Sequence, residues 1–274
     1  MLKTLNNWRY RLYPYLQNVA LDLGLLDGHQ DYERFIILGR SRSGSNFLRG
    51  LLNSHSQLVV LGEIFQNQTK IGWAYPGYLQ TRRNYSLFLN DPIKFLDTKV
   101  FKKFPLQIAA VGFKIFYYHA QTANWQPIWN YLFAQKSLKV IHIKRRNILR
   151  THLSRKLAAM DSNWVNTNGG QEDHRSVTLD YEECLNDFIQ TREWEQNYDH
   201  LFEDHPITEV IYEDLAKDYS EELGRLEEFL GVQAERVKPQ TFKQSNQPLS
   251  QAISNFTELK ARFLGTPWES FFED

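Results

Sequence analysis

Residues 35–52 read FIILGRSRSGSNFLRGLL. The first five residues are a short apolar run, as expected for a buried parallel strand. The last six carry apolar side chains at the spacing of one helix face. Between the two runs, the glycines of residues 39–46 let the backbone close around an anion, and the N–H groups at the helix start point toward it. A strand, a glycine-rich loop and a helix in this order predict a phosphate-binding loop.

This loop differs from that of the nucleoside triphosphatases. Its frame matches G-x-x-x-x-G, but Ser45 and Asn46 follow the second glycine, where those proteins carry a phosphate-binding lysine and a magnesium-binding Ser or Thr. The fixed cations are instead Arg40 and Arg42, and a guanidinium can bind phosphate or sulfate without a metal. We find no His, Cys, Asp or Glu cluster with metal-ligand spacing. The residues expected to hold the anion are Arg40, Ser41, Arg42, Ser43, Gly44, Ser45 and Asn46.

Strand-like and helix-like patterns alternate along the rest of the chain. Further strands are predicted at 58–61, 110–118, 138–143 and 209–212, and helices at 125–134, 147–160, 180–204, 221–230 and 258–264. This alternation predicts one α/β domain of the P-loop-like type, a central parallel sheet covered by helices on both faces. We expect residues 1–34 to form a helical segment packed on a domain of residues 35–274. Two stretches lack clear periodicity. The one near 66–105 is expected to be an acceptor-site insertion with short helices, and the one near 161–178 a lid-like loop.

The composition narrows the class of protein. Lys+Arg and Asp+Glu number 32 each, whereas a chain that coats nucleic acid normally has a basic surplus. The single cysteine, Cys184, cannot form an intramolecular disulfide, which points to a reducing compartment and a cytoplasmic location. No run approaches the roughly 20 apolar residues that span a bilayer. A peripheral membrane contact stays an alternative, made through Trp8, Tyr10 and Tyr13. The sequence does not indicate the oligomeric state.

A second anion site is predicted where the strand at 138–143 ends. Arg146 follows this strand, and Ser154 lies eight positions later, about two helical turns on. An arginine at a strand exit and a serine on the next helix can converge on one anion, at the edge where open α/β sheets bind ligands. Two anion sites on neighbouring strand ends predict one ligand with two separated phosphate groups.

Together these motifs resemble those of the sulfotransferases that use 3′-phosphoadenosine 5′-phosphosulfate (PAPS). GRSRSGSN looks like their 5′-phosphosulfate loop, with Arg42 at the position of the family's lysine or arginine. Arg146 and Ser154 match the spacing of their 3′-phosphate motif. The YEDL segment at 212–215 and the tail at 265–272 resemble bacterial members in particular. The resemblance implies PAPS as donor and 3′,5′-adenosine bisphosphate (PAP) as product. It also implies a place for Lys243 and Ser245 in a segment that folds over the donor.

The resemblance also implies roles in the chemistry. Arg42 would stabilise charge on the leaving phosphate oxygen. Glu63 follows Gly62 at the end of the second strand, and bacterial carbohydrate sulfotransferases carry a glutamate base after a glycine in this region. The rival base is a histidine, as in the cytosolic small-molecule members, with His119 and then His55 as candidates. Lys114, on the strand before His119, could contact the sulfate or the acceptor.

The expected activity is therefore transfer of a sulfuryl group to a hydroxyl of a carbohydrate, glycolipid or small-molecule acceptor. Two alternatives stay open: a P-loop nucleotide kinase or NTPase, and a non-catalytic nucleotide-binding relative. The aromatic and amide side chains of 66–105 and 161–178 suit a sugar, a glycolipid or a phenolic compound equally, so the sequence leaves the acceptor undetermined.

Overall fold

A single parallel sheet forms the centre of the molecule. The computed structural model describes residues 2–161, 176–237 and 247–273. The sheet has five strands in the order β2-β3-β1-β4-β5, all pairs being parallel. The strands are β1 (Glu33–Gly39), β2 (Leu58–Glu63), β3 (Ala110–Phe116), β4 (Lys139–Lys144) and β5 (Ile207–Ile211). The predicted fold class is confirmed, and the last predicted strand begins two residues earlier than expected and ends before Tyr212.

The strand order indicates where along the sheet a ligand is expected to bind. From β1 the chain moves outward to β2, returns to β3, and then crosses β1 to reach β4 and β5. The direction of progress therefore reverses at β1, and open sheets of this kind bind ligands beyond the carboxyl ends of the strands at such a reversal. The predicted phosphate loop leaves β1 at this edge, beside the exits of β3 and β4.

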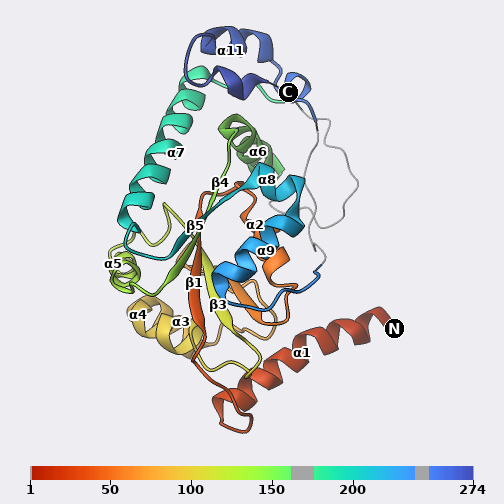
Figure 1. Cartoon of the computed structure of the whole chain (residues 1–274), viewed down its shortest axis with the longest axis vertical. Helices are drawn as coiled ribbons and strands as arrows, with labels where there is room; N and C mark the ends of the chain where they lie inside the picture. The colour runs from red at the N-terminus through yellow and green to blue at the C-terminus, as the bar shows by residue number, and fades with distance from the viewer. Residues whose placement is uncertain (1, 162–175, 238–246, 274) are drawn as a thin grey trace.

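Helices cover both faces of the sheet (Figure 1). The helices of the described residues are α1 (Leu2–Asp22), α2 (Ser45–Leu52), α3 (Arg82–Asn90), α4 (Pro92–Phe95), α5 (Pro127–Ala134), α6 (Ile148–Asp161), α7 (Tyr181–Leu201), α8 (Tyr212–Lys217), α9 (Tyr219–Leu230), α10 (Leu249–Ala252) and α11 (Phe256–Phe263), with a π-helical turn η1 (Leu96–Val100) and a 3₁₀ turn η2 (Glu269–Phe272). No helix within these described ranges is both long and apolar enough to cross a membrane.

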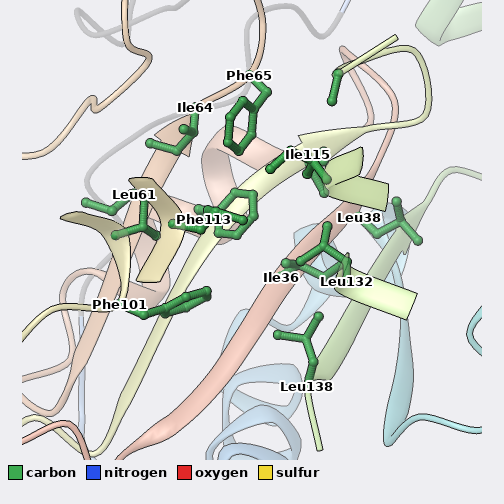
Figure 2. Close-up of a cluster of buried hydrophobic side chains, with 14 of the residues drawn as sticks. Ile36, Leu38, Leu61, Ile64, Phe65, Phe101, Phe113, Ile115, Leu132 and Leu138 are labelled. Atoms are coloured by element: carbon green, nitrogen blue, oxygen red, sulfur yellow. The ribbon is translucent and has the colours of Figure 1, made fainter. Parts of the chain in front are cut away.

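The strands are apolar on both sides because each face packs against a hydrophobic cluster. On one face, Ile36 and Leu38 of β1 join Phe113 of β3 and the side chains of α3, α4 and α5, as Figure 2 shows for part of this cluster. On the other face, Phe35 and Ile37 meet α2 and α9. This alternation explains why the strands read as unbroken apolar runs in the sequence.

A third cluster links α6 and α7 to the C-terminal helices. Leu149 of α6, Phe188 of α7 and Phe263 of α11 are fully buried together. In Figure 1, α7 runs along the side of the domain up to α11. The C-terminal segment is thereby fixed above α6, the helix that carries Ser154.

The region 66–105 contains short helices, as predicted. It contains α3, α4 and η1, and Phe88 and Phe95 pack with Phe65 and Trp125 in the main core. Much of the predicted lid-like loop, residues 162–175, lies outside the described residues.

Candidate active site

The predicted phosphate loop has a backbone that only certain residues tolerate. Gly44 has a φ of 91°, and a Cβ added there would lie 2.0 Å from Cδ2 of Tyr212. Arg42 has a φ of 68°, a left-handed conformation that is uncommon for residues other than glycine. The Arg145 guanidinium holds this turn by donating to the Arg42 carbonyl at 3.2 Å, and its Cζ lies 4.6 Å from the centre of the Tyr212 ring. The start of α8 and the exit of β4 therefore shape the loop.

The two predicted anion sites are in direct contact. Arg42 donates from Nε to Oγ of Ser154 at 2.8 Å, so the loop after β1 and helix α6 meet at this bond. Burial lowers the pKa of Arg42, and the neighbouring Arg145 lowers it further. Because an arginine remains protonated even so, the loop holds a partly desolvated positive charge. Such a charge is well suited to bind an anion.

Arg40 points away from the loop, toward α7. Its guanidinium donates to Oδ1 of Asp187 at 2.5 Å and also to Oγ1 of Thr191. Asp187 also accepts from Arg155 and lies 3.2 Å from Nδ1 of His152. Burial raises the pKa of Asp187, but the three basic side chains outweigh burial and bring it down to about 2. In this arrangement Arg40 anchors the loop to α7, and Asp187 in turn joins α7 to α6.

The other predicted loop residues have local roles in the turn. Ser43 donates its hydroxyl to the Arg40 carbonyl at 2.8 Å, and the backbone N–H of Ser41 donates to the Tyr118 hydroxyl at 3.3 Å. Ser45 is buried in the first turn of α2. These contacts fix the loop, so the backbone N–H groups at the start of α2 do not have to be ordered by a ligand.

A β-bulge determines which way Glu63 points. Leu61 pairs with Phe113, but the register then shifts, so that Glu63 pairs with the very next residue of β3, Lys114. In a regular strand Glu63 would face the same side as Leu61, because side chains two apart share a face. The bulge turns Glu63 to the other face, toward α2. A Cβ on Gly62 would lie 2.4 Å from the Gly72 carbonyl oxygen, so this bulge requires a glycine.

Lys114 connects Glu63 to the phosphate loop. Its Nζ donates to Oε1 of Glu63 at 2.9 Å and to Oδ1 of Asn46 at 2.7 Å. The Lys114 side chain is only 1% exposed, whereas that of Glu63 is 22% exposed. Burial lowers the pKa of Lys114, and the Glu63 carboxylate opposes this effect. An accessible carboxylate is thus held beside the last residue of the loop.

Of the two candidate histidines, only His119 adjoins this carboxylate. Its Nε2 lies 4.0 Å from Oε2 of Glu63. His55 lies before β2, at the amino ends of the strands and so away from the candidate site. Its ring nitrogens bind the Gln57 N–H at 3.1 Å and the Gln233 carbonyl at 2.8 Å. His55 is therefore a structural residue.

Arg146 lies at the exposed rim of the site. Its guanidinium makes a bidentate pair with Asp214, at 2.8 and 2.5 Å, and its side chain is 58% exposed. The backbone N–H of Arg146 donates to Glu213 at 3.0 Å. The YEDL segment therefore supports the strand exit after β4. Lys243 and Ser245 lie outside the described residues.

The structure also shows the surroundings of the single cysteine and of the residue types that bind metals. Cys184 is buried, and burial raises the pKa of its thiol to about 12, so it is not a thiolate nucleophile. Within residues 2–161, 176–237 and 247–273, no group of three or more His, Cys, Asp or Glu side chains is placed to hold a metal ion.

Residues 34–236 match the family model described as the sulfotransferase family, and the chain belongs to that family. Among its relatives, nodulation protein H of Rhizobium tropici is 27% identical over 251 residues, covering 88% of this chain and 93% of that protein. Nodulation protein H of Rhizobium meliloti (strain 1021) is 26% identical over 246 residues, covering 87% and 94%. A solved sulfotransferase from Alicyclobacillus acidocaldarius has a TM-score of 0.49 and 14% identity, covering 84% of this chain and 91% of that one.

The bulge can be tested with two glycine substitutions. Gly62→Ala forces a Cβ against the Gly72 carbonyl, and we expect it to reduce turnover at least about 10-fold because misplaced catalytic groups are costly. Gly224→Ala, in α9, meets nothing within 4 Å and should leave turnover unchanged and raise Tm slightly. Turnover assays and calorimetry measure both effects. Wild-type turnover in Gly62→Ala would show that the bulge does not position Glu63.

Proposed function

We propose that this sulfotransferase takes the sulfuryl group from PAPS and transfers it to an acceptor hydroxyl, with Glu63 as the base. The observation that carries the proposal is the bridge made by Lys114, which bonds both Asn46 of the loop and the Glu63 carboxylate. A proton acceptor thereby lies next to the loop that would hold the sulfuryl donor. Direct transfer requires this proximity, because the attacking oxygen must reach the sulfur and the base together.

The donor site we propose uses the loop and its neighbours. The N–H groups at the start of α2 and the Arg42 guanidinium would hold the 5′-phosphosulfate. Ser154 and Arg146 would hold the 3′-phosphate, with Lys243 and Ser245 as further contacts. The contact between Arg42 and Ser154 supports this proposal, because it brings the two anion-binding elements together as a ligand with two phosphates requires.

When bound, PAPS supplies an already activated sulfuryl group with a phosphate as leaving group. The chain's own residues then have three tasks. Glu63 accepts the proton of the acceptor hydroxyl as that oxygen bonds to sulfur. Arg42 stabilises the charge left on the phosphate oxygen when the sulfur–oxygen bond breaks. Lys114 holds the Glu63 carboxylate in place through Oε1. The protonated carboxyl later releases its proton to water.

The acceptor we propose is a hydroxyl of a carbohydrate, a glycolipid or a small molecule. A nucleotide kinase or NTPase is less compatible with the loop contacts. Ser45 and Asn46 occupy the positions of the phosphate-binding lysine and the magnesium ligand. The Asn46 side chain is bonded to Lys114, and Ser45 is buried.

A thermal-shift titration tests the donor. We expect PAP without magnesium to raise Tm, because a ligand at about 100 times its Kd stabilises the native state by about 2.7 kcal/mol. ATP with magnesium should raise Tm much less. Arg146→Ala should weaken the PAP effect, whereas Lys260→Ala, on the exposed side of α11, should not. No response to PAP, or an equal response to magnesium-ATP, would contradict the proposal.

A further inference from the structure

His119 has one ring nitrogen already engaged by the backbone. The N–H of Phe116 donates to its Nδ1 at 3.1 Å. A nitrogen that accepts a hydrogen bond uses its lone pair, so the proton of the neutral ring must be on the other nitrogen, Nε2. His119 therefore presents an N–H group, and no lone pair, from Nε2. This is the nitrogen that lies 4.0 Å from Oε2 of Glu63.

The ring is held rigidly in that orientation. His119 is 2% exposed. Its backbone is fixed at both ends, because its N–H donates to the Phe116 carbonyl at 2.8 Å and its carbonyl accepts from Nε1 of Trp129 at 2.9 Å. The rings of Phe116 and Tyr118 pack on it at 4.8 and 5.2 Å between centroids. The direction of the Nε2–H group is thus set by the turn after β3.

The surroundings of the ring also keep it neutral. Burial lowers the pKa of His119 to about 4; the Lys114 ammonium adds to this effect and the Glu63 carboxylate opposes it. At neutral pH, Nε2 accordingly keeps its single proton. A base must offer a lone pair to the acceptor hydroxyl, and the only one on this ring is engaged with the Phe116 N–H.

We infer that His119 is a positioning residue that donates from Nε2–H to Oε2 of Glu63, while Lys114 holds Oε1. This inference rests on the proposed role of Glu63 as base. The distance of 4.0 Å exceeds a direct hydrogen bond, so the carboxylate must approach the ring by about 1 Å to accept it. Within the described residues, Nε2 of His119 is buried and has no hydrogen-bond partner, and satisfying such a donor favours the approach. With both oxygens held, the remaining lone pairs of Glu63 are fixed toward the acceptor.

Two substitutions of His119 separate positioning from base catalysis. His119→Gln keeps an N–H donor near the position of Nε2, whereas His119→Leu keeps the bulk without the donor. We expect kcat to fall about 100-fold in His119→Leu, with little change in acceptor KM, and to recover to within about 10-fold in His119→Gln. Both should retain the rising limb of the pH–rate profile. If His119→Gln is as inactive as His119→Leu and that limb disappears, His119 is the base and the inference is wrong.

A measurement without turnover gives an independent test. In ¹⁵N NMR of the imidazole groups, with the His119 signals assigned from His119→Gln, we expect the Nε2–H tautomer and no titration between about pH 5.5 and about pH 8. Glu63→Gln should shift the Nε2–H resonance. An Nδ1–H tautomer, a pKa near its ordinary value, or an unchanged resonance in Glu63→Gln would overturn the inference even if PAP binds. Failure of PAP to bind would instead overturn the proposed function.

Discussion

Glu63→Gln should reduce turnover by about 10²- to 10⁴-fold, the range that general-base catalysis contributes. Glutamine has nearly the same shape but cannot take the proton of the acceptor hydroxyl. It retains an oxygen that can accept from Lys114, so the buried ammonium keeps a partner. PAP affinity and Tm should therefore stay close to wild type. Loss of turnover with retained PAP binding is the result that identifies a base.

Single-turnover assays with PAPS and titrations with PAP measure the two quantities separately. Glu258→Gln, an exposed glutamate on α11, is the matched control and should behave as wild type. Wild-type turnover in Glu63→Gln would mean that another group takes the proton. A large drop in Tm would instead assign Glu63 a structural role through Lys114.

Arg42→Gly is expected to reduce turnover by about 10²- to 10³-fold, as when one charge-stabilising donor is removed. Its effect on stability should be small, because two changes oppose each other. The substitution removes the bond to Ser154, but glycine adopts the φ of 68° without strain. It also relieves the repulsion between the Arg42 and Arg145 guanidiniums. We expect the free energy of unfolding to change by no more than about 1 kcal/mol.

Urea titrations and turnover assays on the same preparation test this combination. Lys260→Ala removes one exposed positive charge from α11 and serves as the control for net charge. A protein that loses stability in proportion to its turnover would show that Arg42 acts mainly on the fold. Turnover at the wild-type level would remove Arg42 from the proposed mechanism.

The fold was largely predictable because the signals for it are local. Residues 35–52 contain a strand, a turn and a helix start whose apolar spacing is visible in sequence. The buried parallel strands are short unbroken apolar runs, because both faces are covered. In the region 66–105 the short helices are predictable but their packing is not, since it depends on aromatic contacts to Phe65 and Trp125 from outside the region.

The candidate site was predictable in its parts but not in its arrangement. Arg40 and Arg42 are equivalent as sequence, yet Arg40 turns to Asp187, some 150 residues away, while Arg42 reaches Ser154. No local pattern distinguishes them, because the partners come from α7 and α6. Likewise the pairing of Arg146 with Asp214 depends on how β4 meets α8. The sequence places Lys114 on its strand, but its bridge to Asn46 and Glu63 depends on the sheet register.

The bulge at Gly62 also affects how this chain is compared with other proteins. Gly62 is an extra residue in β2, because it has no partner of its own in β3. When β2 is aligned residue for residue with a regular strand of another protein, the two strands therefore differ in register by one residue from Glu63 onward. A relative with the same number of residues but a regular strand here would carry a glutamate at the corresponding column yet direct it to the face of Leu61, the aromatic core. A relative with a one-residue deletion at Gly62 would direct the glutamate to the same face as in this chain. A glutamate in this column of a relative therefore corresponds to Glu63 only when the bulge, or a one-residue deletion in its place, is present as well.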